Sequence, residues 1–356
     1  MTDLLELAAE LVDTPSVSRD ESAMADRVES ELRQCDWLQV LRDGDNVVAR
    51  TDLGRSQRLV VAGHLDTVPP NGNSGARVED EVLWGVGAAD MKGGLAVMLD
   101  LARSTDQPSV DVTWCFYARE ELARTESGLA ALWREQPDLL RADAAVVCEP
   151  TSSLVEAGCQ GTMRVVIHVG GIRAHTARPF AGLNAIHRLG PVIDRVAQWQ
   201  GRSITLDGCE YVEQLQAVAV EGGVAGNVVP DHASLTVNYR FAPDRDAAGA
   251  RAFLQALLDE LLDERQADRV EVIDEADGAP PSLDHPLLAA LVAGSDAPPR
   301  AKVGWTDVAS FWAHGVPAAN FGPGDPLLAH HPDERVDRQD LTRARTVLGS
   351  VLTGPD

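Results

Sequence analysis

Short apolar runs separated by helix-like spacings constrain the fold of this chain more than any other feature. The runs lie at residues 47–49, 58–62, 112–117 and 144–148, and each is typical of a buried strand. Apolar residues at helical spacing predict helices near residues 4–11, 24–32 and 91–103. Strands that alternate with helices favour a layered α/β architecture.

The middle of the chain has a different order of elements. Strands are expected at residues 163–169, 212–220, 234–240 and 270–273, with helices at 186–196 and 254–261. The order β-α-β-β-α-β is typical of a ferredoxin-like domain. We therefore predict a discontinuous catalytic domain (1–162 and 275–356) with an inserted domain at 163–274. Two domains also suit a chain of 356 residues.

Composition narrows the class of partners. The net charge of −24, from 55 acidic and 31 basic residues, argues against a nucleic-acid partner. No apolar stretch approaches the ~20 residues that span a membrane, and the N-terminus lacks a signal-peptide pattern. We expect a cytoplasmic protein with no membrane partner, whose five scattered cysteines are reduced and buried.

Acidic and histidine side chains follow the predicted strands. They are His64, Asp66, Asp90, Glu120, Glu121, Glu149 and, in a later loop, His330. Ligands of open α/β sheets bind beyond the carboxyl ends of the strands, where these residues fall. Two divalent cations carry a charge of +4, which three carboxylates and a bridging hydroxide would neutralise. The pattern predicts a two-metal hydrolytic site.

Each of these residues also has an ordinary structural explanation. Asp90 could cap the helix that follows it, and Glu120 and Glu121 could lie in a solvated loop. Asp66, two residues after His64, could orient the histidine ring through a hydrogen bond or simply begin a turn. The common placement of the whole set, rather than any single member, favours the metal site.

The motifs around these residues resemble those of the M20 family of zinc amidohydrolases. The matching segments are 63–68, 87–93, 120–121 and 329–334, and the resemblance spans nearly the whole chain. It implies a zinc-peptidase-like catalytic domain, with a mixed sheet flanked by helices, and an inserted α+β lid and dimerisation domain. Val86 departs from the family, because many relatives carry arginine there.

The resemblance implies two metal sites that share one ligand. His64, Asp90 and Glu149 would hold one Zn²⁺, and Asp90, Glu121 and His330 would hold the other. The Ala-His-x-Pro-Asp-Glu motif selects His330 rather than His331. Co²⁺ or Mn²⁺ could replace Zn²⁺.

The resemblance also implies the catalytic and substrate-binding residues. Asp66 would orient His64, Glu120 would be the general base, and His175 would reach the active site of the partner in a homodimer. The substrate-binding residues would be Asn227, Arg178, Arg240 and Thr306. The remaining histidines match no motif and are interpreted as structural: His168, His187, His232, His285 and His314.

Segments 304–309 and 320–326 look most like those of actinobacterial succinyl-diaminopimelate desuccinylases. That similarity implies hydrolysis of a small dicarboxylate amide, N-succinyl-LL-2,6-diaminopimelate, in lysine biosynthesis. The alternatives are another M20 amide hydrolase, such as an N-acetylornithine deacetylase or a metallocarboxypeptidase, and a silent binding module. A silent module would usually have lost a ligand or the base, and none is missing here.

Overall fold

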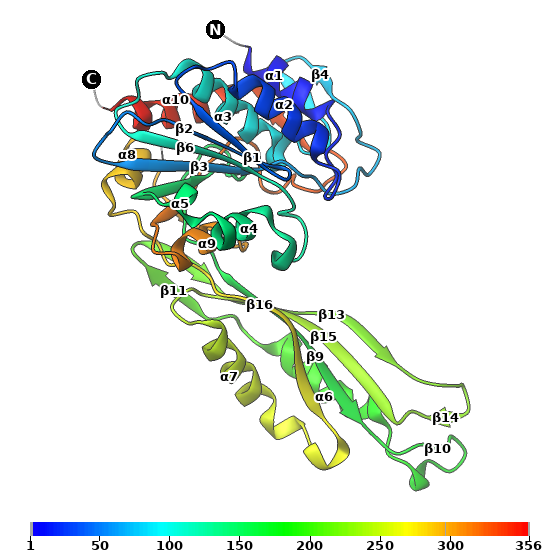
Figure 1. Cartoon of the computed structure of the whole chain (residues 1–356). Coiled ribbons are helices and arrows are strands. Elements are labelled where there is room, and N and C mark those ends of the chain that lie inside the picture. Colours follow the sequence, from blue (N-terminus) through cyan, green and yellow to red (C-terminus); the bar gives the residue numbers. More distant parts are fainter. Residues whose placement is uncertain (1–2, 296, 355–356) are drawn as a thin grey trace. The chain divides into compact units, whose positions relative to one another are not determined.

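The computed structural model describes residues 3–295 and 297–354, which form two compact units (Figure 1). Unit 1 contains the chain up to Ala157, Pro281–Arg300 and the chain from Ser310 onward. Unit 2 contains Gly158–Pro280 and Ala301–Ala309. All five cysteines are free and buried. Among the described residues, no helix has both the length and the apolar character needed to cross a membrane.

An eight-stranded mixed sheet forms the centre of unit 1. Its inner strands run parallel in the order β6 (Asp111–Tyr117), β3 (Arg58–His64), β7 (Ala144–Val147) and β18 (Ala318–Asn320). Its outer strands are β1 (Gln39–Asp43), β2 (Asn46–Arg50), β8 (Glu156–Ala157) and β17 (Arg300–Ala301). β6 and β7 are buried along their whole length, which explains their uninterrupted apolar runs. The expected mixed sheet is confirmed.

The register of the parallel strands places their carboxyl ends side by side. His64 at the end of β3 pairs with Tyr117 at the end of β6, and Ala62 pairs with Val147 at the end of β7. Three neighbouring parallel strands therefore have their carboxyl ends at the same end of the sheet. The predicted site residues begin at these strand ends.

Helices lie on both faces of this sheet (Figure 1). On one face α3 (Gly93–Ser104) is almost wholly buried under α1 (Leu4–Val12), α2 (Ser22–Leu32) and α10 (Arg338–Thr353). The opposite face carries α4 (Gly128–Glu135), α5 (Pro137–Leu140) and α9 (Val308–Ala313). A further helix of unit 1, α8 (Pro286–Gly294), packs against α10. Helices thus flank the sheet, as expected.

A small second sheet brings the C-terminal part of unit 1 back to the site. It contains β19 (Arg335–Asp337), β5 (Val82–Trp84) and β4 (Arg77–Glu79), in that order. Gly85, just after β5, donates a backbone hydrogen bond of 3.1 Å to Glu334, just before β19. The loop that carries His330 is therefore held beside the loop that leads to Asp90.

Unit 2 is built on an antiparallel sheet with the strand order of a ferredoxin-like fold. The order is β13 (Gln214–Gly222), β15 (His232–Phe241), β9 (Gly161–Gly170) and β16 (Arg269–Ala276). Alternate residues of β9 are buried against α6 (Ala185–Gln198) and α7 (Ala247–Leu258). The predicted order β-α-β-β-α-β is confirmed.

Two short antiparallel pairs complete unit 2. β10 (Ala174–His175) pairs with β14 (Val228–Val229), and β11 (Ser203–Leu206) pairs with β12 (Cys209–Val212). The predicted strand at 212–220 was wrong in its bounds, because β12 and β13 are separate strands divided at Glu213. The buried Glu213 carboxylate accepts hydrogen bonds from the Tyr239 hydroxyl at 2.9 Å and the Ala242 amide at 3.0 Å.

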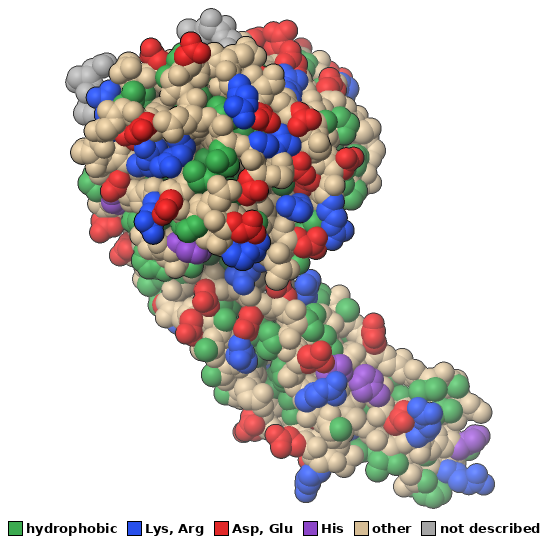
Figure 2. All heavy atoms as spheres, in the orientation of Figure 1, with side chains coloured by type: hydrophobic (Ala, Val, Ile, Leu, Met, Phe, Trp, Pro, Cys, Tyr) green, Lys and Arg blue, Asp and Glu red, His purple; other side chains and the backbone are tan. Residues whose placement is uncertain are grey.

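Charged side chains of both signs are dispersed over the surface. On the face drawn in Figure 2, Lys and Arg are scattered among Asp and Glu on both units rather than gathered in one patch. Many of the arginines pair with neighbouring carboxylates, as Arg19 does with Glu126 at 2.9 Å. On this face the acidic side chains therefore do not by themselves mark a site.

Candidate metal centre

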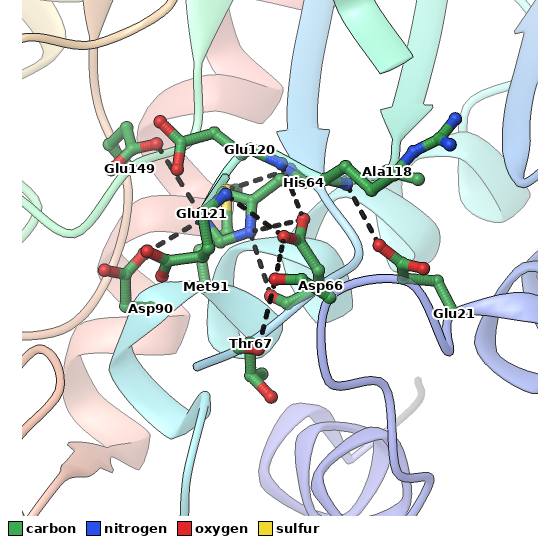
Figure 3. A network of polar contacts seen from close by, with 12 residues as sticks. Glu21, His64, Asp66, Thr67, Asp90, Met91, Ala118, Glu120, Glu121 and Glu149 are labelled. Atoms are coloured by element: carbon green, nitrogen blue, oxygen red, sulfur yellow. Dashed lines mark hydrogen bonds and ion pairs between the residues drawn. The ribbon is translucent and has the colours of Figure 1, made fainter. Parts of the chain in front are cut away.

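The strand ends of unit 1 bring the predicted ligands together. His64 ends β3, Glu121 lies in the turn after β6, and Glu149 lies two residues after β7. Asp90 comes from a π-helical turn (Ala88–Lys92) before α3, and His330 comes from the loop before β19. Figure 3 shows Asp90, Glu121 and Glu149 gathered around His64.

Asp90 does not cap the helix that follows it, so the simpler explanation of this residue was wrong. α3 begins at Gly93 rather than at residue 91, and its N-cap is Lys92. Asp90 has the non-helical backbone angles φ −118° and ψ 93°. Its carboxylate faces the two histidines instead.

Two groups of ligand atoms share Asp90. In the first group, His64 Nε2 lies 3.1 Å from Asp90 Oδ1 and 3.9 Å from Glu149 Oε1. In the second, His330 Nε2 lies 2.7 Å from Glu121 Oε1 and 3.4 Å from Asp90 Oδ2. Within each group the ligand atoms lie within 4.8 Å of one another. Asp90 thus turns one oxygen toward each group, as a bridging carboxylate would.

The carboxylates of this cluster stabilise the protonated, positively charged forms of its two histidines. Burial lowers the pKa of His64, but hydrogen bonds with Asp66 and Asp90 outweigh burial and raise that pKa well above its usual value. Hydrogen bonds with Asp90 and Glu121 raise the pKa of His330 to about 10. Burial raises the pKa of Asp90, but the two histidines outweigh it and hold that pKa far below its usual range. Divalent cations could replace the protons on both histidines, because metal-bound imidazole is neutral.

Asp66 makes more contacts than the one with His64 that the sequence predicts. His64 Nδ1 lies 3.0 Å from the backbone oxygen of Asp66 and 3.5 Å from its carboxylate. That carboxylate also accepts hydrogen bonds from the amides of Glu120 (3.0 Å) and Glu121 (3.1 Å) and from the Ser18 hydroxyl (2.8 Å). It is therefore placed to hold both the histidine and the acidic turn.

Glu334 is a site residue that our sequence analysis missed. It is 1% exposed, and Oε1 accepts hydrogen bonds from the amides of Ala89 (3.1 Å) and Asp90 (3.0 Å). Burial raises the pKa of its carboxyl group to about 7. The signal was present, since Glu334 closes the Ala-His-x-Pro-Asp-Glu motif. Its carboxylate fixes the backbone that carries Asp90.

The predicted residues of unit 2 fall into two places. His175 in β10 is exposed and pairs with Val228, next to Asn227; Arg178 lies exposed nearby. Arg240 and Thr306 lie at the other end of the sheet, near Cys159. Residues 232–240 of β15 run from the place that contains His175 to the place that contains Arg240. A strand rises about 3.3 Å per residue, so the two places lie roughly 25 Å apart. Within one copy, unit 2 therefore does not bring His175 and Arg240 together.

A sheet with parallel inner strands and histidine–carboxylate groups beyond their ends is typical of metallohydrolases. The chain belongs to the peptidase family M20/M25/M40, whose sequence profile matches residues 60–353.

Two relatives that match this chain over nearly their full length share the same enzyme name. A Mycobacterium tuberculosis protein with the provisional name succinyl-diaminopimelate desuccinylase DapE is 51% identical over 99% of this chain and 98% of its own. The Corynebacterium glutamicum succinyl-diaminopimelate desuccinylase is 42% identical over 99% of this chain and 96% of its own. An M20 metallo-carboxypeptidase from Sulfolobus solfataricus shares the fold, with a TM-score of 0.80, 16% identity and 99% coverage of both chains.

Proposed function

We propose that this enzyme hydrolyses N-succinyl-LL-2,6-diaminopimelate to succinate and LL-2,6-diaminopimelate, as a cytoplasmic step of lysine and diaminopimelate biosynthesis. One observation carries the hydrolytic part of the proposal: Asp90 faces two histidine-containing ligand groups at once. A bridged pair of cations is the arrangement that a two-metal hydrolase needs. The two full-length relatives named above support this substrate.

The ligand set suits two Zn²⁺ ions. Imidazole nitrogen and carboxylate oxygen are ordinary zinc ligands, and they also bind Co²⁺ and Mn²⁺. His64 and Glu149 would hold one ion and Glu121 and His330 the other, with Asp90 between them. When bound, such ions lower the pKa of water and polarise a carbonyl group.

Glu120 is the general base of the proposed reaction. A carboxylate oxygen of Glu120 lies within 4.8 Å of ligand atoms of His64 and Glu121, so it borders the centre without belonging to either group that contains Asp90. Glu120 takes a proton from the attacking water and delivers it to the leaving amine nitrogen. The amide bond is then replaced by a carboxylate on succinate and an amine on the second product.

Residues of unit 2 bind the substrate and its developing charge. The exposed His175 ring stabilises the oxyanion by a hydrogen bond. Arg240 holds a substrate carboxylate; it is half-buried, and burial lowers its pKa. Arg178, Asn227 and Thr306 complete the proposed substrate contacts.

The active enzyme is proposed to be a homodimer. His175 and Arg240 lie too far apart in one copy of unit 2 to contact the same small substrate. The edge strand β13 exposes Val218 (56%) and Val220 (58%) on an open sheet edge, where a second copy could pair. Sedimentation of the purified protein should give a mass of two chains.

A substrate panel tests the proposed function. The zinc-loaded enzyme should hydrolyse N-succinyl-LL-2,6-diaminopimelate at least about 100-fold more efficiently than N-acetylornithine or a dipeptide. The preference arises from substrate carboxylates that the other compounds lack. The fold shared with a metallo-carboxypeptidase makes peptide hydrolysis the second candidate. A higher kcat/KM on a peptide would select that alternative.

A further inference from the structure

The turn that carries Glu120 and Glu121 begins at a residue in a left-handed conformation. Arg119 has a φ of 60°, which is unfavourable for a residue with a side chain. The turn directs the chain from the end of β6 toward the metal centre. Something must hold the backbone here, because relaxation at Arg119 would redirect both carboxylates.

A buried carboxylate from the N-terminal part of the chain contacts this point. Glu21, just before α2, is 0% exposed, and its Oε1 accepts a hydrogen bond of 3.1 Å from the Arg119 amide. Figure 3 shows Glu21 reaching the chain beside Ala118. Asp66 accepts from the next two amides, so two buried carboxylates hold three consecutive amides of the turn.

The segment before Glu21 is itself fixed to the strand end that carries His64. The Thr67 amide donates to the Ser16 oxygen at 2.9 Å, and the Ser18 amide donates to the Thr67 oxygen at 3.1 Å. The Ser18 hydroxyl donates to Asp66. Glu21 therefore reaches Arg119 from a rigid support rather than from a free loop.

Burying the Glu21 carboxylate lowers the stability of the fold unless its hydrogen bond to the turn compensates. Within the described chain, no basic side chain lies within ion-pair distance of its carboxylate, and burying a charge without a partner is unfavourable. Burial raises the pKa of this carboxyl group. An apolar side chain of similar size would fill the space at lower cost, but it could not accept the Arg119 amide.

We propose that Glu21 is a positioning residue for the Glu120–Glu121 turn: it holds Arg119 in its left-handed conformation and so aims the general base and one metal ligand. This inference rests on the proposed roles of Glu120 and Glu121. Displacements of about 1 Å at a catalytic group can cost about 100-fold in rate.

Two substitutions of Glu21 separate positioning from simple packing. Glu21→Leu removes the acceptor, and Glu21→Gln keeps an acceptor oxygen at the same place. With both metals bound, Glu21→Leu should lower kcat at least about tenfold with KM changed less than about threefold, whereas Glu21→Gln should stay within about threefold of the parent. Zn²⁺ affinity, measured by competition with a chelator, should fall at the Glu121 site in Glu21→Leu alone.

A second substitution, at Arg119, tests whether the activity lost in Glu21→Leu can be recovered. Glycine adopts positive φ freely, so Arg119→Gly in the Glu21→Leu background should recover at least about threefold in kcat. The matched control is Asp111→Leu, which likewise removes a buried carboxylate acceptor. Asp111 begins β6 and accepts the Leu53 and Arg55 amides. It lies roughly 20 Å from the other end of β6, and the folded variant should keep the parent kcat and zinc affinity.

The inference fails if Glu21→Leu keeps the parent kcat and zinc affinity. It also fails if folded Asp111→Leu loses as much activity, or if Arg119→Gly gives no recovery. Glu120→Gln is assayed in parallel. If Glu120→Gln is active, the proposed catalytic role itself is wrong; if it is inactive while Glu21→Leu is normal, only the positioning role is wrong.

Discussion

Asp66 Oδ1 lies 3.0 Å from the backbone nitrogen of Glu120. The other carboxylate oxygen lies 3.1 Å from the nitrogen of Glu121. Asp66 also follows His64 by two residues and contacts its ring through the backbone oxygen. One buried carboxylate thus joins the end of β3, with one proposed ligand, to the turn after β6, with another.

Replacement of Asp66 should therefore damage catalysis beyond its effect on one histidine. Asp66→Ala leaves two partly buried amides without this acceptor, at a cost of at most about 1–3 kcal/mol each in stability. We expect kcat to fall at least about 100-fold, because both the ligand and the base lose support. Steady-state kinetics and thermal unfolding of the zinc-loaded variant would measure the two effects. Unchanged kcat would contradict the proposed role.

The proposed role of Asp90 as a ligand shared by both metal sites predicts that different substitutions remove different amounts of metal. Asp90→Ala removes a ligand from both groups, so the variant should bind neither Zn²⁺ tightly. Glu149→Ala removes a ligand from one group only and should keep one tightly bound ion. Metal content after dialysis would distinguish the two variants. Equal metal content in both variants would argue against a shared ligand.

The pKa of His330 predicts how the metal-free protein responds to pH. Its folded-state pKa of about 10 lies above the ordinary value of 6.5. The stabilisation is therefore fully present below pH 6.5 and is lost as the pH rises through about 10. In metal-free protein, His330→Gln should flatten the fall in melting temperature over this window. His331→Gln is the control, since that exposed ring contacts neither Asp90 nor Glu121 at ion-pair distance.

Zinc binding should also depend on the protonation of His330, but it should strengthen rather than weaken as the pH rises. Zn²⁺ competes with the proton on His330, so the apparent zinc affinity should rise with pH until the pH passes the folded-state pKa of about 10. Titration calorimetry in buffers of different ionisation enthalpy would count the protons released. Release of no proton at pH 8 would contradict the assigned ligand.

The separation of His175 and Arg240 predicts active mixed dimers. A dimer of one His175→Ala chain and one Glu120→Gln chain has one site with an intact base and an intact histidine from the partner. Mixing the two inactive variants under exchange conditions should restore activity to that one site. Asp90→Ala mixed with Glu120→Gln should restore none, because both defects lie in unit 1. No recovery in the first mixture would assign His175 to its own subunit.

The sequence was most informative where apolar strands end in polar residues. Parallel strands align their carboxyl ends, so His64, Glu121 and Glu149 could be placed together from the sequence alone. Ser18, Glu21 and Glu334 could not, because their side chains accept from or donate to groups far along the chain. The break at Glu213 was missed for the same reason, since a residue pattern does not reveal the distant partners of a buried carboxylate.

The most direct test is a titration of metal-free enzyme with Zn²⁺, followed by hydrolysis of N-succinyl-LL-2,6-diaminopimelate. Activity should rise to a plateau at two equivalents of zinc, and the products should be succinate and LL-2,6-diaminopimelate in equal amounts. A protein that binds two Zn²⁺ ions and leaves this substrate intact would contradict the account.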